Sequence, residues 1–411
     1  MEKTAINKIL DIKESFELPD RLMSILFSWQ KDEVLDKFME LGESLDHDWF
    51  TEYFEEEHAN KTKMAQDFTP HEIGELLAGI VGYGDKVADI CSGTGGLTIA
   101  YWNKYKESRF LCIELSSRAI PFLLLNLCIR NIAGKVIQMD ILTGEVFSSY
   151  VLIKGARFSA IAKCDELFIP DVDVVISNPP YSLRYFAQED ESRFGEFAGM
   201  LPSNFADYCF IAMGLTICKG PCAYILPHGV LFRGNKEGAM RERLCKSRMI
   251  RGVIGLPERL FINTDIPTCI VLFAKSDTAF FIDAKSKCIK DKAKNKMLPE
   301  HISEIVEVFN NRKQVAQLSH IATNEEIEDN DFNLNISRYV DSFIKEPPPD
   351  LGLVAKELLE IDMSLDKVKR DLIKMLRDLQ GNDEDSKNIK AYISYLEGKK
   401  EGRYEQIRLD L

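Results

Sequence analysis

Five consecutive residues of the chain carry groups that suit one particular reaction. Ser177-Asn178-Pro179-Pro180-Tyr181 follows the apolar run 172–176. A planar amino nitrogen is a poor nucleophile, but if the Asn178 side-chain oxygen and the Pro179 carbonyl each accept one of its hydrogens, its lone pair points at a methyl donor. The two prolines fix the backbone in advance, and Tyr181 offers a ring on which an extruded base can stack. The pattern indicates methylation of an amino or amide nitrogen, although a strand followed by a proline-rich turn also explains it.

A glycine-rich turn upstream has the composition of a nucleotide-type site. A strand expected over 86–90 runs into Cys91-Ser92-Gly93-Thr94-Gly95-Gly96, and a helix is expected over 97–104. Glycines let the backbone approach a ligand closely, and Asp89 before the turn is expected to accept a hydrogen bond from a bound group. The glycine spacing is tighter than G-x-G-x-x-G, which argues against a nicotinamide dinucleotide. NAD-dependent enzymes, kinases and plain tight turns share such loops.

Two further expected strands also end in acids. The strand expected over 109–113 ends at Glu114, 18 residues after Gly96, a spacing that suits an acid binding ribose hydroxyls. The strand expected over 135–139 ends at Asp140-Ile141, where an acid and an apolar side chain can read an adenine. Each acid alone is typical of a solvated strand end. Together, at the carboxyl ends of one βαβ series, they predict a ligand site.

The segment before the first strand completes the order of motifs. Thr69 suits an N-cap and Pro70 the first helical position, so a helix is expected over 70–81. The order of cap helix, glycine loop, two acids and Asn-Pro-Pro-Tyr resembles amino-methyltransferases. More narrowly, it resembles the modification subunits of type I restriction–modification systems.

The resemblance covers roughly residues 65–340. It includes the later blocks 206–210, 225–233, 255–261, 266–273 and 331–339. Departures are local: Asp67 stands where the family has an aromatic residue, Ile90 replaces a proline, and Cys91-Ser92 replaces Ala-Cys. Tyr181 stands where many members have Phe, and either ring can stack.

The resemblance implies a fold, an activity and a cofactor. The expected fold is α/β, a Rossmann-like S-adenosylmethionine-dependent methyltransferase sheet over 65–345, with an acidic helical region over 1–64 and a coiled-coil-like helical tail over 350–411. The expected activity is that of a site-specific DNA adenine-N6 methyltransferase using S-adenosylmethionine. The expected catalytic residues are Asn178, Pro179, Pro180 and Tyr181; the expected cofactor-binding residues are Phe68, Thr69, Pro70, Asp89, Ser92, Gly93, Thr94, Gly95, Gly96, Glu114, Asp140, Ile141 and Asn178.

The charge balance favours a partner that brings the chain to DNA. The net charge is −13 and the pI about 5.2, an unusual balance for a protein that grips a polyanion unaided. Residues 1–60 hold sixteen acids against six bases and are expected to form small helices, for example over 22–29 and 33–41. Two basic clusters, 233–251 and 285–296, are candidates for phosphate contacts, and the first is preferred because it follows the expected strand 226–232.

The C-terminal part has the periodicity of a helix that needs a partner. Apolar residues recur in steps of three and four from Leu351 to Leu379, which is a heptad seam ended by 381–383. The alternative is an intrachain hairpin with the pattern Ile389, Ile393 and Leu396. The resemblance implies that this region meets a specificity subunit, with two copies of this chain per specificity subunit. It also implies a restriction subunit as a further candidate partner.

Other features limit the class of protein. The sequence shows no apolar run of the length of a membrane span and no basic-then-apolar leader, so a cytoplasmic protein is expected. Its ten cysteines include no C-x-x-C pair, so they are expected to be reduced. The histidines show no spacing for a metal and there is no P-loop, so neither a metal nor a motor is expected. Two other hypotheses stay open: a protein-glutamine or RNA-guanine methyltransferase with the same loop, and an inactive scaffold. The recognised DNA site and any preference for half-methylated DNA are not readable from these residues.

Overall fold

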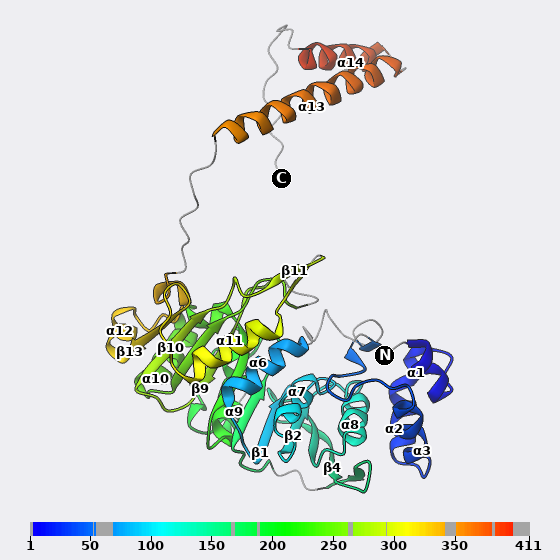
Figure 1. Cartoon of the computed structure of the whole chain (residues 1–411), viewed down its shortest axis with the longest axis vertical. Coiled ribbons are helices and arrows are strands. Elements are labelled where there is room, and N and C mark those ends of the chain that lie inside the picture. The colour runs from blue at the N-terminus through cyan, green and yellow to red at the C-terminus, as the bar shows by residue number, and fades with distance from the viewer. Residues whose placement is uncertain are drawn as a thin grey trace. The chain divides into compact units, whose positions relative to one another are not determined.

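The chain forms two compact units, residues 1–342 and 343–411. The computed structural model describes residues 3–51, 53–54, 69–165, 169–186, 190–261, 266–292, 294–341, 351–379 and 383–397 (Figure 1). Of the expected functional segments, 65–68 with Phe68 and the triple proline 347–349 lie outside these residues. No helix of the described ranges is long and apolar enough to cross a membrane.

The first unit is built on an eleven-stranded sheet with the order β13-β10-β8-β9-β7-β6-β1-β2-β3-β4-β5. β13, β9 and β4 run antiparallel to their neighbours, and the other strands are parallel to one another. The strands are β1 (Lys86–Ile90), β2 (Arg109–Glu114), β3 (Gly134–Met139), β4 (Val146–Ile153), β5 (Ala160–Lys163), β6 (Val174–Ser177), β7 (Cys222–Pro227), β8 (Ile250–Gly255), β9 (Thr268–Phe273), β10 (Thr278–Asp283) and β13 (Ser319–Thr323). A separate two-stranded hairpin joins β11 (Ile289–Asp291) and β12 (Lys294–Lys296).

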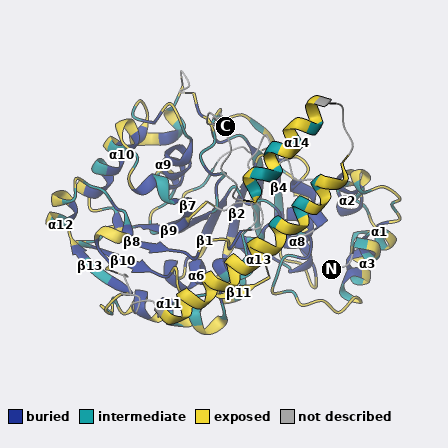
Figure 2. Ribbon diagram, turned by 90° about the horizontal axis from the view of Figure 1, so that it is seen from above, coloured by how far each residue is buried: buried dark blue, intermediate teal, exposed yellow. Residues whose placement is uncertain are grey.

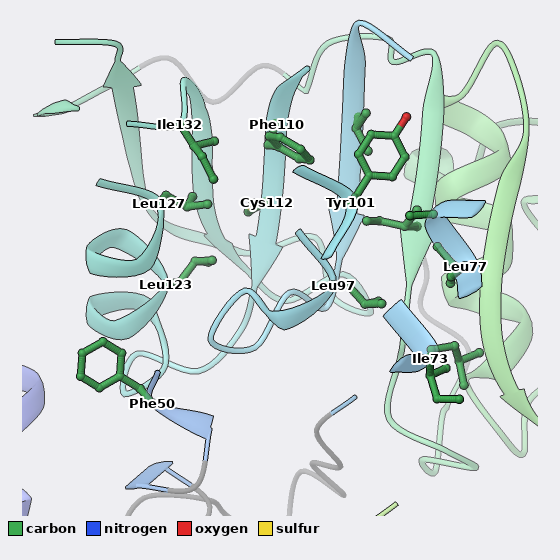
Figure 3. Packing of buried hydrophobic residues seen from close by; sticks show 14 of the residues in the cluster. Phe50, Ile73, Leu77, Leu97, Tyr101, Phe110, Cys112, Leu123, Leu127 and Ile132 are labelled. Atoms are coloured by element: carbon green, nitrogen blue, oxygen red, sulfur yellow. The ribbon is translucent and has the colours of Figure 1, made fainter. Parts of the chain in front are cut away.

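Both faces of the sheet are covered, because alternate strand residues belong to two different cores. In β2, Phe110 and Cys112 pack in one core and Leu111 and Ile113 in the other. The first core receives α6 (His71–Val81), α7 (Gly96–Lys104), α8 (Ile120–Ile129) and α11 (Pro299–Asn310); Figure 3 shows Ile73, Leu97 and Leu123 reaching toward the strands. The second core receives α9 (Asp207–Ile217), α10 (Asn235–Lys246) and α12 (Asn324–Asp329). Short 3-10 turns are η1 (Ser15–Glu17), η2 (Ser192–Phe197), η3 (His228–Leu231) and η4 (Ile336–Arg338).

The acidic N-terminal region shares the first of these cores. Its helices are α1 (Lys3–Leu10), α2 (Leu18–Leu26) and α3 (Lys31–Met39), and their buried residues join the cluster that contains α8. Phe54 stacks edge-on against Phe122 of α8 with ring centroids 5.2 Å apart. On α2 and α3, Asp20, Asp32 and Glu33 are exposed, while the buried residues of these helices pack toward the sheet layer.

The second unit is a pair of helices, α13 (Leu351–Asp378) and α14 (Asp383–Leu396). Arg377 and Glu397 form an ion pair of 2.7 Å between them. The heptad seam remains open to solvent: Val354, Leu358, Ile361, Leu365, Val368, Met375 and Leu379 are all exposed, as the yellow ribbon of α13 in Figure 2 shows. The intrachain hairpin forms but leaves the seam uncovered, and a partner on the seam stays a prediction.

Most expected elements are confirmed within one or two residues, including the helix over 70–81 and the strands over 86–90 and 279–283. The strand expected over 226–232 is wrong, because β7 ends at Pro227 and residues 228–231 form the 3-10 turn η3. The helix expected over 22–29 begins at Leu18 and ends at Leu26. Pro19 lies in its first turn, where a missing N–H costs nothing, so the helix starts earlier than its apolar pattern indicated.

Candidate active site

The glycine turn, both acids and the asparagine motif meet at one edge of the sheet. β1 lies between β2 and β6 and is parallel to both, so the carboxyl ends of these strands are neighbours. A cavity of about 150 Å³ opens there. One side, the glycine wall, consists of Ser92, Gly93, Gly96, Glu114, Asp140 and Ile141; the other, the asparagine wall, consists of Thr69, Asn178, Pro179 and Pro180.

The glycine turn owes its shape to residues in the left-handed region. Gly93 has φ 56° and Gly95 has φ 100°, conformations that favour glycine. At Gly96, the first residue of α7, an added Cβ would meet, among the described residues, the Thr69 carbonyl oxygen at 3.9 Å. The backbone of the turn is therefore open to the cavity, as a site for a closely approaching ligand requires.

Glu114 links the end of β2 to the glycine turn. Its Oε2 accepts a hydrogen bond from Gly93 N at 2.8 Å, and its Oε1 accepts one from Ser116 N at 2.7 Å. Burial raises the pKa of this carboxyl group, while the N–H donors lower it. Each carboxylate oxygen has a further lone pair, so Glu114 can hold the turn and accept from a ligand at once.

Asp140 and Ile141 reach the cavity as their strand end predicted. Asp140 Oδ1 accepts from Leu142 N at 2.8 Å, which shapes the turn after β3. Arg193 donates from Nε to the Ile141 carbonyl at 2.9 Å and also contacts the Leu142 carbonyl. Ile141 is buried and faces the cavity, so this end of the site combines an acid with an apolar surface.

Asp89 points away from the cavity, contrary to the expectation that it meets a bound group directly. It is fully buried, and its Oδ2 accepts from the Thr98 hydroxyl of α7 at 2.6 Å. Its Oδ1 has no hydrogen-bond partner among the described residues. Burial, opposed by the bond to Thr98, raises the pKa of Asp89 to about 7. Asp89 supports the glycine turn from beneath, because Ser92 Oγ also donates to its carbonyl oxygen at 2.7 Å.

Asn178 is held by side chains on both of its polar atoms. Its Nδ2 donates to Thr69 Oγ1 at 2.9 Å, and its Oδ1 accepts from the Tyr181 hydroxyl at 2.7 Å. Thr69 precedes α6, so the expected cap residue serves the asparagine. In this arrangement the amide oxygen accepts from Tyr181 and the amide nitrogen donates to Thr69, and an amide oxygen has two lone pairs with which it can accept.

The Tyr181 ring is packed in the interior, which corrects the expectation of a free stacking face. Its exposed fraction is 8%, and it meets Phe261 edge-on with ring centroids 6.0 Å apart. Tyr181 does not line the cavity, whereas Pro179, Pro180 and Phe210 do. In this conformation the tyrosine orients Asn178 through its hydroxyl, and stacking on its ring requires that the ring turn outward.

The loop after the motif is anchored by a buried charge. Asp207, fully buried, accepts from Ser182 N at 3.0 Å and from Arg233 Nη1 at 2.9 Å. Arg233 Nη2 donates to Ser182 Oγ at 2.7 Å and Nη1 also contacts Glu237 at 3.2 Å. Arg233 therefore fixes the loop, and its charge is already paired.

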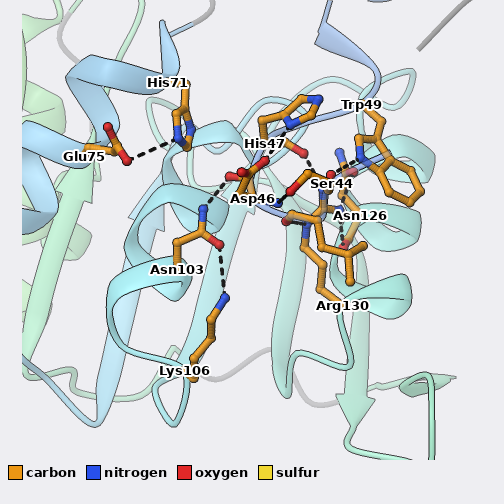
Figure 4. Close-up of polar contacts among 11 residues, drawn as sticks. Ser44, Asp46, His47, Trp49, His71, Glu75, Asn103, Lys106, Asn126 and Arg130 are labelled. Atoms are coloured by element: carbon orange, nitrogen blue, oxygen red, sulfur yellow. Dashed lines mark hydrogen bonds and ion pairs between the residues drawn. The ribbon is translucent and has the colours of Figure 1, made fainter. Parts of the chain in front are cut away.

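An N-terminal segment that the sequence did not single out braces the glycine turn from behind. Asp48 Oδ1 accepts from Asn126 Nδ2 at 2.6 Å, and Asp48 also accepts from the hydroxyls of Thr51 and Thr94. Arg130, almost fully buried, donates to the Leu45 and His47 carbonyls and lies over the Trp49 ring at 5.3 Å. Figure 4 shows Asn126 of α8, and Arg130 directly after that helix, beside this segment. The run Asp46-His47-Asp48-Trp49 matches no motif that would predict that this segment supports the glycine turn.

The remaining expected site residues occupy supporting positions. Thr94 is buried and bonded to Asp48, Gly95 packs against Leu123, and Pro70 precedes the first turn of α6. The structure thus brings together at the cavity the ten residues of the two walls, and it leaves Asp89, Thr94, Gly95, Pro70 and Tyr181 outside its lining.

Comparisons with known proteins identify the family of the chain. The family model described as N-6 DNA Methylase matches residues 47–346. The chain is 27% identical over 327 residues to the type I restriction enzyme MpnII methylase subunit of Mycoplasma pneumoniae, covering 76% of this chain and 59% of that protein. It is 24% identical over 411 residues to the MjaVII methylase subunit of Methanocaldococcus jannaschii, covering 90% of this chain and 68% of that protein. A crystal structure of a type I restriction–modification methyltransferase subunit from Streptococcus thermophilus matches with a TM-score of 0.58 at 30% identity, covering 67% of this chain and 59% of that one. The chain thus spans about three fifths of the length of the first and third of these relatives.

Proposed function

Because the chain belongs to the N-6 DNA methylase family, we propose that it transfers a methyl group from S-adenosylmethionine to N6 of an adenine extruded from DNA. The observation that carries this proposal is the pair of walls around one cavity. Asn178, the glycine turn and both acids line the same cavity, so one small volume joins an amino-group acceptor with a nucleotide-type site. The relatives are named methylase subunits of type I restriction enzymes, which supports DNA as the substrate class.

The glycine wall fits the cofactor. Glu114 and Asp140 lie at the ends of neighbouring strands and have lone pairs left for ribose hydroxyls and an adenine amino group. Ile141 and Leu115 supply apolar surface, and the open face of Gly96 admits a ligand close to the backbone. When bound, S-adenosylmethionine supplies a methyl group on a positively charged sulfur. Phe68, expected to contribute, lies outside the described residues.

The asparagine wall fits an exocyclic amino group. Asn178 Oδ1 is aimed by the Tyr181 hydroxyl and its Nδ2 is held by Thr69, so the acceptor is positioned before a base arrives. The Pro179 carbonyl follows directly and has a backbone fixed on both sides by proline rings. These acceptors withdraw the two N–H hydrogens from the plane of the base and stabilise the positive charge that develops on nitrogen. No strong base is needed.

We also propose that the chain acts as a modification subunit delivered to DNA by a specificity subunit, two copies to each. The net charge of −13 disfavours unaided binding to a polyanion. The open seam of α13, with Leu358 57% and Ile361 61% exposed, is suited to a helix of that partner. Replacing Leu358, Ile361 and Leu365 by serine is expected to abolish co-purification, whereas serine at Lys356, Glu360 and Lys367 on the same helix is the matched control. Equal loss, or no loss, in both variants would contradict docking through the seam.

The activity is tested by offering the chain a choice of substrates. We would incubate it with labelled S-adenosylmethionine and DNA, RNA or protein, with and without a co-expressed specificity chain. Label in DNA is expected, and it should increase with the partner. Label in protein or RNA alone would favour the other uses of the Asn-Pro-Pro-Tyr loop, and no label in any arm would indicate an inactive scaffold.

A further inference from the structure

We propose that the β11–β12 hairpin holds phosphates of the DNA next to the target base, which rests on the proposed function above. The hairpin spans residues 289–296 and leaves the sheet soon after β10 ends at Asp283. β10 is parallel to β8, and through β9 and β7 to β6 and β1, so the hairpin starts from the same edge of the sheet as the cavity. Figure 1 shows it projecting beyond that edge.

The outer part of the hairpin carries unpaired positive charge. Lys290 and Lys292 are exposed and Lys294 is half-buried, and none of the three forms an ion pair with a described residue. The neighbouring lysines closer to the base are paired: Lys285 with Asp283 at 3.0 Å and Lys287 with Glu304 at 2.7 Å. Asp291 is the acid within the hairpin strands.

Contacts at the base of the hairpin join it to two segments that neighbour the asparagine wall. One is the segment 258–261, which contains Phe261, and the other is helix α6. Asn295 donates from its backbone to the Arg259 carbonyl at 3.0 Å and from Nδ2 to the Glu258 carbonyl at 2.8 Å. Two residues further along, Phe261 meets the Tyr181 ring. On the other side, Lys296 pairs with Glu72 of the first turn of α6 at 3.3 Å, and α6 follows Thr69. The free lysines therefore project from a platform that touches the neighbours of Asn178.

The first basic cluster, which the sequence analysis preferred, is less available. Arg233 is paired with Asp207 and Glu237, Arg243 with Glu196, and Lys246 with Glu242. Arg241 is buried and donates to the Phe332 carbonyl at 2.8 Å. Residues that already neutralise an acid release no counterions from DNA when they approach it, so they contribute little to phosphate binding.

The chemistry of the hairpin points to the DNA backbone rather than to base edges. Lysine is a compact point charge that pairs with phosphate. The hairpin strands carry no arginine or glutamine, and Asn295 of β12 already donates to the Glu258 carbonyl. Phosphate contacts fix the register of a duplex without reading its sequence, which leaves recognition to the partner. Lys290, Lys292 and Lys294 also supply positive charge near the cavity, in a chain whose net charge is −13.

The test compares two triple variants of the full chain. One carries Lys290→Gln, Lys292→Gln and Lys294→Gln. The control carries Lys86→Gln, Lys219→Gln and Lys275→Gln, three exposed lysines at the opposite edge of the sheet. Each chain is co-expressed with a specificity chain, because the net charge of −13 disfavours unaided binding to DNA. The affinity of the complex for a fluorescent duplex of about 30 base pairs is measured by anisotropy across a series of salt concentrations, beside the thermal unfolding temperature and the affinity for S-adenosylmethionine.

We expect the hairpin variant to bind the duplex at least tenfold more weakly at low salt. Its slope of log K against log salt should be shallower by about 2.7, which is 0.9 for each of three lost contacts. The control should match the wild type, and both variants should retain cofactor affinity and unfolding temperature. A hairpin variant with the affinity and slope of the control overturns the inference.

Two other outcomes also decide against the hairpin. If the variant keeps its affinity for DNA but loses a co-purifying specificity chain, the lysines bind an acidic protein instead. If the wild type binds no duplex, the hairpin is not a DNA contact. The proposed function fails separately, when the wild type transfers no label to DNA in the substrate assay.

Discussion

The two walls of the cavity are held in place by different kinds of contact. On the glycine wall, Glu114 accepts from backbone N–H groups of Gly93 and Ser116, and the turn takes its shape from positive φ angles. On the asparagine wall, Asn178 is held between the hydroxyls of Thr69 and Tyr181. In the proposed function, backbone contacts hold the glycine wall, which binds the cofactor. Side-chain contacts aim a single oxygen, so changes on the two walls should have separable effects on affinity and on turnover.

The largest effect is expected from Asn178→Ala. It removes the acceptor of the amino hydrogens, and loss of one positioned dipole of this kind costs about 10²–10³ in kcat. Affinity for S-adenosylmethionine, measured by calorimetry, should stay within about threefold because the glycine wall is untouched. A variant with normal turnover would refute the dipole mechanism, and one that binds no cofactor would refute the separation of the walls.

Glu114→Ala should have the opposite profile. It removes a buried acceptor and leaves Gly93 N–H without its partner, so cofactor affinity should fall about 10- to 100-fold. At saturating cofactor, kcat should remain near that of the wild type. Glu114→Gln keeps the shape and one acceptor, so an intermediate affinity is expected. Unchanged affinity in both variants would exclude Glu114 from the cofactor site.

Asp48→Ala tests whether the N-terminal segment braces the glycine wall. It removes the acceptor of Asn126 and of the Thr94 hydroxyl, both buried, and should lower the free energy of unfolding by about 2 kcal/mol. Asp46→Ala is the control, because Asp46 lies in the same segment and its side chain is 60% exposed. Cofactor affinity should fall in the first variant only, and equal stabilities would contradict the brace.

The pH dependence of stability should report Asp89. Its pKa is about 7 in the folded chain and 3.8 ordinarily, so between these values the folded chain binds more protons than the unfolded chain. The free energy of unfolding should therefore decrease as pH rises toward 7, by about 1 kcal/mol between pH 6 and 7, and level off above. Asp89→Asn should remove this component. Parallel wild-type and variant curves from chemical denaturation between pH 5 and 8 would show that Asp89 does not titrate there.

The smallest effect is expected from Tyr181→Phe, which keeps the ring and removes its hydroxyl. Loss of one hydrogen bond to Asn178 should cost about 0.5–1 kcal/mol, seen as a two- to fivefold lower kcat with unchanged cofactor affinity. A larger loss in Tyr181→Ala, with cofactor affinity kept, would show that the ring itself acts during turnover, after moving from its place against Phe261.

The sequence was sufficient for the features that depend on local pattern. Apolar runs ending in Glu114, Asp140 and Asn178 predicted three strand ends, and the parallel sheet brings all three to one cavity. The outward-facing heptad of α13 was readable in the same way. Such features follow from residues close together in the chain, whose spacing is printed in the sequence.

Features that depend on distant partners were missed or misread. Asp89 turns inward because Thr98 lies beneath it, and Tyr181 is packed because Phe261 comes from another strand connection. Arg233 was expected to be a candidate for phosphate contacts, but Asp207 neutralises its charge in the fold. Asp48 carried no signal, since its partners on α8 follow almost eighty residues later. The sequence alone does not show whether a basic residue is paired with an acid from a distant part of the chain.

The central claim is that the cavity methylates N6 of adenine in DNA, and identification of the product nucleoside tests it most directly. DNA incubated with the chain, a co-expressed specificity chain and S-adenosylmethionine carrying a deuterated methyl group would be digested and analysed by mass spectrometry. We expect the label in N6-methyladenine, with Asn178→Ala giving at most about 1% of the wild-type amount. Label in methylcytosine, or in protein or RNA but not in DNA, would contradict the account.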